Sequence, residues 1–130
     1  MGNTYNILHN RHDHSNKEQT MNKVELYGRI TKDHKINTTT DGTKYTKFNL
    51  AVQRRFKNKE GEKDADIISC IAWDKTAENL EKLTEKGNRV AVVGHLQSRF
   101  YEAEGEPKYA LEVIVDELFV IDYKKAEVDF

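Results

Sequence analysis

The sequence predicts a mainly-β domain, in which five strands close into a Greek-key barrel and one α-helix lies between strands 3 and 4. Three observations predict this fold class. Apolar residues alternate with polar residues in several segments, which is the period of a β-strand. Glycine-containing turns separate these segments. One segment, residues 74–88, changes to the spacing of an amphipathic helix.

The first two strands are predicted on either side of a hairpin turn. Residues 24–31 alternate between apolar and polar side chains, and Gly28 within them predicts a bulge or a bend. The pair Asp41-Gly42 is a strong hairpin signal. The second strand is expected at residues 45–53, with one apolar face made by Phe48, Leu50 and Val52.

The third strand and the helix follow a basic segment and another turn. Residues 65–73 are apolar on both faces, as expected of a central, well-covered strand, and the single cysteine among them, Cys70, is expected to be a small core residue. In the next segment Ala77, Leu80 and Leu83 share one helical face, and Gly87 comes where the helix would end. Asp74 or Thr76 is expected to cap the helix.

The last two strands are expected at residues 89–102 and 108–122, joined by a turn through Gly105 and Pro107. Five twisted, glycine-interrupted strands cannot bury one face as an open sheet, and a single helix can plug one end of the barrel that they form. The oligonucleotide-binding (OB) fold has this arrangement. The residues expected to face its core from these two strands are Val90, Val92, Leu96, Tyr109, Leu111, Val113 and Val115.

The chain divides into one domain with two short ends. Residues 1–20 are polar and aperiodic and are expected to be a disordered extension, residues 21–122 form the OB domain, and residues 123–130 form a short acidic tail. The sequence has no apolar run long enough to cross a membrane and no secretory signal, so we expect a cytoplasmic protein. Common catalytic and nucleotide-binding motifs are absent, so we expect no enzymatic activity, no cofactor and no metal.

Cations gather around one aromatic residue, although the net charge is only −1. Phe56 is expected in the loop between the second and third strands. The surrounding segment, residues 44–63, has two acids, Glu60 and Glu62, and seven cations: Lys44, Lys47, Arg54, Arg55, Lys57, Lys59 and Lys63. A solvated hairpin is the simpler interpretation of such a charge run.

Aromatic residues beside cations recur on other strands. Strict alternation places Trp73 on the outer face of the third strand, and Arg99 and Tyr101 on the outer face of the fourth. Exposed rings stack on unpaired bases while cations bind phosphates, so this pattern favours single-stranded nucleic acid with little sequence preference. The alternative, that Trp73 and Tyr101 are covered by the helix or by a partner subunit, has similar weight.

The order and spacing of several motifs resemble the bacterial single-stranded DNA-binding protein family, including its phage-encoded members. The resemblance covers residues 21–121 and rests on MNKVELYGRITKD, FNLAVQRRF and ADIISCIAWDKTAENLEKLTEKGNRVAVVGHLQSR. It implies an OB fold and non-enzymatic, largely sequence-independent binding and protection of single-stranded DNA in replication, recombination and repair. It also implies a homotetramer, with a homodimer as the alternative, in the cytoplasm of a bacterium or of a phage's host.

The resemblance also assigns the stacking rings. They fall here on Phe56, Trp73 and Tyr101, while Ile67 stands where the family often has another ring. From position and charge we expect phosphate contacts from Arg54, Arg55, Lys57, Lys75 and Arg99.

The end of the chain resembles an abbreviated form of the family's partner-binding tail. Glu127, Asp129 and Phe130 keep the acids and the terminal ring that recruit replication and recombination proteins. The alternative is an ordinary frayed end.

Two other functions stay open on the sequence. An RNA-binding OB domain would use a similar surface, because stacking and phosphate contacts do not by themselves recognise the 2′-hydroxyl. A protein-interaction module would instead bury the rings at subunit contacts.

Overall fold

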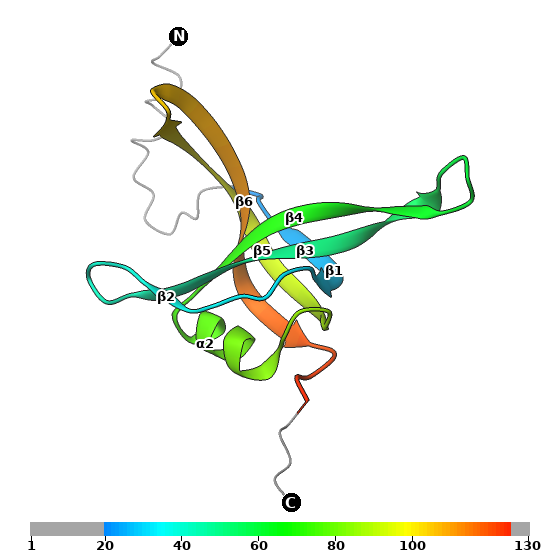
Figure 1. Ribbon diagram of the computed structural model, residues 1–130, viewed down its shortest axis with the longest axis horizontal. Helices are drawn as coiled ribbons and strands as arrows, with labels where there is room; N and C mark the ends of the chain where they lie inside the picture. The colour runs from blue at the N-terminus through cyan, green and yellow to red at the C-terminus, as the bar shows by residue number, and fades with distance from the viewer. Residues whose placement is uncertain (1–19, 126–130) are drawn as a thin grey trace, which may run out of the picture.

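Five long strands form a closed barrel in the computed structural model, which describes residues 20–125 (Figure 1). The strands lie in the order β1-β5-β6-β4-β3, and a further pairing of β1 with β3 closes the barrel. Neighbouring strands are antiparallel except for β4 and β6, which are parallel. The predicted mainly-β OB barrel, with one helix between the third and fourth long strands, is confirmed. The elements are β1 Val24–Ile30, β2 Asn37–Thr38, β3 Lys44–Lys57, β4 Lys63–Trp73, α2 Asp74–Leu83, β5 Arg89–Ala103 and β6 Glu106–Val120.

Strand β1 closes the barrel by pairing with two strands at once. Its residues 24–29 pair with β5, and Arg29 and Ile30 also pair with β3. A Cβ atom on Gly28 would overlap the carbonyl oxygen of Ala51, so only glycine allows β1 and β3 to approach this closely. The pairing of β1 with β5 runs through Gly28 without a shift, so of the predicted bulge or bend, the bulge is wrong.

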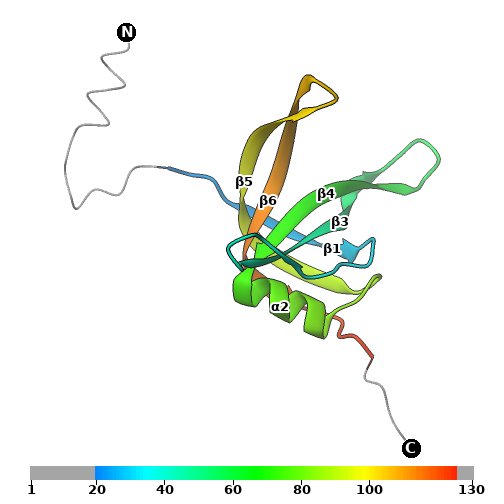
Figure 2. The ribbon, with the colours of Figure 1, turned by 60° about the vertical axis from the view of Figure 1, so that its left-hand side comes forward.

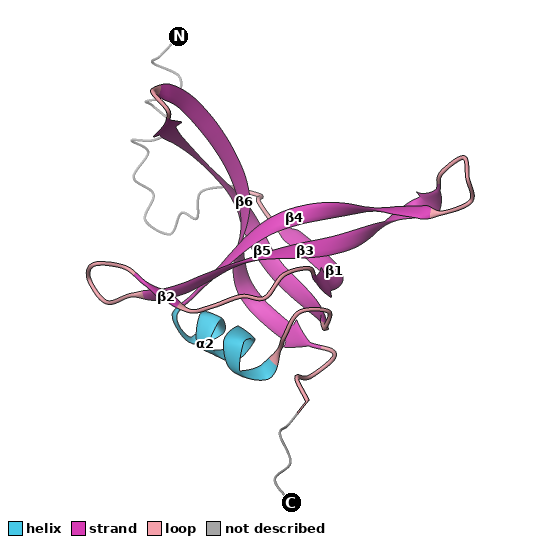
Figure 3. Ribbon diagram, viewed as in Figure 1, coloured by secondary structure: helices cyan, strands magenta, loops and turns pink. Residues whose placement is uncertain are grey.

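The core fills the barrel and is closed at one end by α2 (Figure 3). Ala77 and Leu80 are the buried residues of the helix. Burial also raises the pKa of the Cys70 thiol to about 12, as expected for a core thiol. The residues that the strands contribute to the core cluster are Ile30, Phe48, Leu50, Cys70, Ala72, Val90, Val92, Val113 and Val115.

The helix begins without a side-chain cap. Trp73 occupies the N-cap position and makes no capping hydrogen bond, so the predicted cap by Asp74 or Thr76 is wrong. At the other end the Thr84 hydroxyl donates to the Leu80 carbonyl (2.5 Å), and the chain then turns toward β5 through Gly87, whose φ is 92°.

Two hairpins extend from the barrel on the side away from α2 (Figure 2). We call them the β3–β4 arm, residues 54–64, and the β5–β6 arm, residues 97–111. The basic segment that was predicted as a loop is strand as far as Lys57, and the turn follows it at residues 58–62. There the Asn58 side-chain oxygen accepts from the backbone N–H groups of Glu60 and Glu62, both at 2.9 Å.

The β5–β6 arm turns in only two residues. Glu104 and Gly105 have φ values of 54° and 78°, as a tight hairpin turn requires, and Pro107 already lies in β6. Leu96, Tyr109 and Leu111, which were predicted in the core, are exposed. They continue the inward-facing alternation, but they lie at or beyond the point where the barrel ends and nothing in the described chain covers them.

Several predictions concern the ends of the chain. Glu127, Asp129 and Phe130 lie outside the described residues, as does the predicted extension except for Thr20. Across residues 20–125, no helix combines the length and the apolar character needed to span a membrane.

Candidate nucleic-acid interface

The outward-facing residues of β3, β4, β6 and β5 lie side by side on one face of the barrel wall, where Ile71 is buried and Lys47 and Trp73 reach solvent. Lys47 pairs with Ile71, Ile71 with Ile114, and Ile114 with His95, so the four strands are in register across the barrel wall. Because side chains alternate along a strand, every second residue from these positions faces the same side. We call six of these residues the outer track: Tyr45, Lys47, Trp73, Arg99, Tyr101 and Glu112.

Two aromatic rings lie at the α2 end of the outer track. Trp73, the last residue of β4, pairs with Tyr45 of β3. Their ring centroids are 5.1 Å apart with an angle of 37° between the planes, which is a normal aromatic contact. Trp73 is 37% exposed, so its ring is held by Tyr45 and still reaches solvent.

The opposite end of the outer track lies on the β5–β6 arm. Tyr101 is 44% exposed, and the guanidinium of Arg99 lies 5.0 Å from the centroid of its ring. This distance allows a cation–π interaction, which orients the arginine beside the ring. Neither Trp73 nor Tyr101 is therefore a core ring of the single chain, and both rings keep enough exposed surface to contact a ligand.

A cluster of three charged residues lies between the two ends. The Glu112 carboxylate accepts a hydrogen bond from Arg99 Nε at 3.1 Å and lies 4.0 Å from Lys47 Nζ. Glu112 belongs to β6, Arg99 to β5 and Lys47 to β3, so the cluster spans the width of the outer surface.

Phe56 lies apart from the outer track. It is 80% exposed on the β3–β4 arm, and the guanidinium of Arg55 lies 6.0 Å from its ring centroid. The two arms leave the barrel in different directions (Figure 1), so Phe56 and Tyr101 do not form one platform within the chain. The structure thus places Trp73 and Tyr101 on one surface, as predicted, and places Phe56 elsewhere.

The predicted phosphate-binding cations differ in whether an acidic side chain already pairs with them. Arg54 is held by Asp66, with an Nη2–Oδ1 distance of 2.8 Å, and this ion pair lowers the pKa of the Asp66 carboxyl. Within residues 20–125, Arg55, Lys57 and Lys75 make no ion pair. Lys75 is exposed in the first turn of α2, two residues after Trp73.

Two further residues lie on the outward sides of β5 and β4. His95 of β5 lies with its Nδ1 3.0 Å from Asp116 Oδ2 of β6. Ile67 is 58% exposed on the outward side of β4, so this strand is not covered along its whole length as expected. At the position where the family often has another aromatic ring, the chain therefore exposes an aliphatic side chain.

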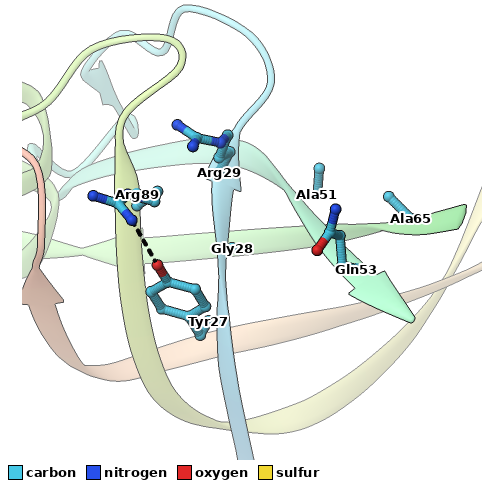
Figure 4. A pocket seen from close by; sticks show the side chains of 7 residues that line it. All are labelled: Tyr27, Gly28, Arg29, Ala51, Gln53, Ala65 and Arg89. Atoms are coloured by element: carbon cyan, nitrogen blue, oxygen red, sulfur yellow. Dashed lines mark hydrogen bonds between the residues drawn. The ribbon is translucent and has the colours of Figure 1, made fainter. Parts of the chain in front are cut away.

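A pocket of about 420 Å³ lies where β1 meets β3 and β5 (Figure 4). Both of its arginines are engaged by the protein itself. Arg29 donates to the Gly87 carbonyl at 3.0 Å, while Arg89 donates to the Tyr27 hydroxyl at 3.2 Å and binds Asp122. The sequence did not indicate this pocket, whose lining is Tyr27, Gly28, Arg29, Ala51, Gln53, Ala65 and Arg89.

Sequence reasoning missed three members of the outer track, namely Tyr45, Lys47 and Glu112. Alternation carried a signal for all three, because Phe48 and Leu50 inward imply Lys47 outward, and Val113 inward implies Glu112 outward. The contact of Tyr45 with Trp73 and the contacts of Glu112 with Arg99 and Lys47 depend on strand register, which alternation does not give.

Comparison with known proteins gives a consistent result. The Single-strand binding protein family matches residues 21–121. "Single-stranded DNA-binding protein 1" of Streptococcus pyogenes serotype M18 is 40% identical over 103 residues, which are 78% of this chain and 79% of that protein. "Single-stranded DNA-binding protein 1" of Lactococcus lactis is 38% identical over 108 residues, or 82% of this chain and 72% of that protein.

A solved structure is also similar. The Plasmodium falciparum SSB in complex with ssDNA superposes with a TM-score of 0.70 and 25% sequence identity. The match covers 82% of this chain and the whole of that chain.

Proposed function

The chain belongs to the single-strand binding protein family, and from this premise we propose that its outer track is the surface that binds single-stranded DNA. The chain is a binding protein and not an enzyme. It binds single-stranded DNA without strong sequence preference and protects it during replication, recombination and repair. The observation that carries the assignment of the surface is that exposed rings lie at the two ends of the outer track and cations lie between them.

The chemistry of the outer track fits a flexible polyanion with exposed bases. Trp73 and Tyr101 offer flat surfaces at its two ends, and base stacking on such rings contributes about 1–3 kcal/mol per base. Lys47 and Arg99 lie between the rings, where they bind the phosphates that link the stacked bases. Lys75 continues the cationic path beyond Trp73.

The β3–β4 arm provides a second contact region. Phe56 stacks on a base there, and Arg55 and Lys57 bind the adjoining phosphates. Arg54 contributes less than its neighbours, because Asp66 already neutralises its charge. A bound DNA strand reaches this arm by passing from the outer track to another region of the protein surface, since Phe56 is not on the outer track.

The protein acts as a homotetramer, with a homodimer as the alternative assembly. An exposed apolar face on the inward-facing side of the β5–β6 arm supports self-association, because apolar patches of this kind mark interfaces. Within the cytoplasm, the acidic tail with Glu127, Asp129 and Phe130 recruits replication and recombination proteins.

Titration of Trp73 fluorescence tests the assignment. Because Trp73 is the single tryptophan and is part of the outer track, oligo(dT) should quench it. Duplex DNA should bind much more weakly, since its bases are not available for stacking. Affinity for oligo(dT) should fall as salt rises, because each phosphate contact releases counterions.

Substitutions identify the binding surface in the same titration. Tyr101→Ala should weaken oligo(dT) binding by about 1–3 kcal/mol, whereas Tyr101→Phe should retain it. Tyr123→Ala removes an exposed ring outside the outer track and is the matched control. Equal losses for Tyr101→Ala and Tyr123→Ala would rule out the proposed surface, and tighter binding of oligo(U) than of oligo(dT) would favour RNA as the ligand.

A further inference from the structure

Glu112 is the charged residue at the centre of the outer track. Its carboxylate lies between two cations from different strands, 3.1 Å from Arg99 Nε and 4.0 Å from Lys47 Nζ. The Glu112 side chain is only 13% exposed, while those of Lys47 and Arg99 are 52% and 44% exposed. The acid therefore lies beneath two cations whose outer sides are open to solvent.

The two cations keep donors for a second anion. In the described chain, Arg99 donates to Glu112 through Nε, and no hydrogen bond is formed by its two terminal nitrogens. Carboxylates and phosphates accept charge-assisted hydrogen bonds from the same donors. The Glu112 carboxylate is thus the same kind of hydrogen-bond acceptor for Lys47 and Arg99 as a phosphate of the DNA backbone would be.

We propose that Glu112 is an internal competitor of the DNA backbone. In free protein its carboxylate holds Lys47 and Arg99, and when a strand binds, phosphates take over part of both contacts. This inference rests on the proposed function, since it assumes that the outer track binds single-stranded DNA. Its consequence is that the protein binds DNA less tightly, and releases it faster, than its cations alone would allow.

The other ion pairs within the described residues do not have this property. Asp66 holds one cation, Arg54, on the β3–β4 arm, and Asp122 holds one cation, Arg89, at the pocket. Of the acids in residues 20–125, only Glu112 pairs with two cations, and both of these belong to the outer track.

Glu112→Gln is the central test, with Glu117→Gln as its matched control. Glu117 lies in the same strand, is exposed, and makes no ion pair in the part of the chain that the structure describes. Both substitutions change the net charge equally. Affinity for oligo(dT) is measured over a range of salt by Trp73 fluorescence, dissociation is measured by stopped flow, and folding is checked by urea unfolding.

We expect Glu112→Gln to bind several-fold more tightly than Glu117→Gln and to dissociate more slowly. The plot of log affinity against log salt should become steeper by about 0.7 for each additional phosphate that Lys47 or Arg99 binds in the variant. The proposal is overturned if Glu112→Gln binds no more tightly than the control while wild-type protein binds normally. Failure of wild-type protein to bind oligo(dT) would overturn the proposed function, and this inference with it.

A second variant separates competition from a purely structural ion pair. Lys47→Gln should cost more binding in the Glu112→Gln background than in wild-type protein, because Lys47 is free to bind phosphate only when Glu112 does not hold it. Equal costs in the two backgrounds would contradict the proposal even if Glu112→Gln proved less stable.

Discussion

Arg89 and Asp122 join the first residue of β5 to the chain just beyond β6. Arg89 donates to the two carboxylate oxygens through Nε at 2.8 Å and Nη2 at 2.9 Å, and its backbone N–H donates to the same side chain at 3.0 Å. These hydrogen bonds hold the pKa of the Asp122 carboxyl at about 2, below its ordinary value of 3.8. One aspartate thus fastens the last strand of the barrel beside the first residue of β5.

The lowered pKa of Asp122 predicts an acid-dependent loss of stability. A carboxyl with a lower pKa in the folded state stabilises the fold above its unfolded pKa, and this contribution is lost as pH falls from about 4 through about 2. We therefore expect Asp122→Asn to lower the urea midpoint at pH 7, and the difference from wild-type protein to disappear toward pH 2.

The matched control for this prediction is Asp33→Asn. Asp33 is exposed and makes no ion pair within residues 20–125, so its substitution should leave the urea midpoint nearly unchanged at both pH values. A midpoint difference for Asp122→Asn that is the same at pH 7 and pH 2 would contradict the role assigned to the Arg89–Asp122 pair.

At the scale of elements, the two arms show what the sequence pattern predicts and what it does not. Alternation assigned Phe48 and Leu50 inward and Trp73 and Tyr101 outward, because the two-residue period is a local property of a strand. It did not show how far the barrel extends. Tyr109 therefore seemed a core residue, although it lies on an arm that no other element of residues 20–125 covers.

The β3–β4 arm was predicted as a loop for a related physical reason. A hairpin exposed on both faces lacks the apolar alternation that identifies a half-buried strand, so Arg54, Arg55 and Lys57 resemble loop residues in sequence. What fixes them as strand is their continuity with the buried part of β3 and the turn capped by the Asn58 side chain. For the candidate site, local pattern predicted the rings. The contact of Glu112 with Arg99 depends on the register of the β5–β6 hairpin, and its contact with Lys47 depends on the parallel pairing of β4 with β6, which joins residues distant in sequence.

The β3–β4 arm should add to DNA affinity mainly through charge. Lys57, Lys59 and Lys63 make no ion pair in the described chain, so each is free to contact a phosphate. Replacing all three by glutamine should reduce the slope of log affinity against log salt by up to about 2, at about 0.7 per contact, with little change in the urea midpoint.

Three lysines near α2 supply the control for the arm. Lys82, Lys86 and Lys124 are exposed, and they too make no ion pair within residues 20–125. Their replacement by glutamine changes the net charge equally but removes no proposed phosphate contact. Similar changes in slope for the two triple variants would show that net charge, and not the arm, determines binding.

In the molecule as a whole, nothing within residues 20–125 covers the side of the β5–β6 arm that continues the barrel interior. Phe100, Tyr109 and Leu111 are exposed there, and Leu96 is exposed next to the arm. The ring centroids of Phe100 and Tyr109 lie 5.3 Å apart across the two strands. This apolar face is continuous with the alternation that fills the barrel, so the arm presents core-like side chains to solvent. A second copy of the chain would bury them and leave the outer track, on the opposite side of the same strands, open to DNA.

Replacing two residues of this face should therefore disrupt the assembly without removing the DNA-binding surface. For Phe100→Gln combined with Leu111→Gln, light scattering coupled to gel filtration should show a mass shifted toward that of one 15.1 kDa chain, whereas wild-type protein should show about four times that mass. Ile67→Gln, which removes an exposed apolar residue from the outward side of β4, should leave the mass unchanged. Because the outer track faces the other way, the double variant should still bind a short oligo(dT), and an unchanged mass would show that the arm is not the subunit contact.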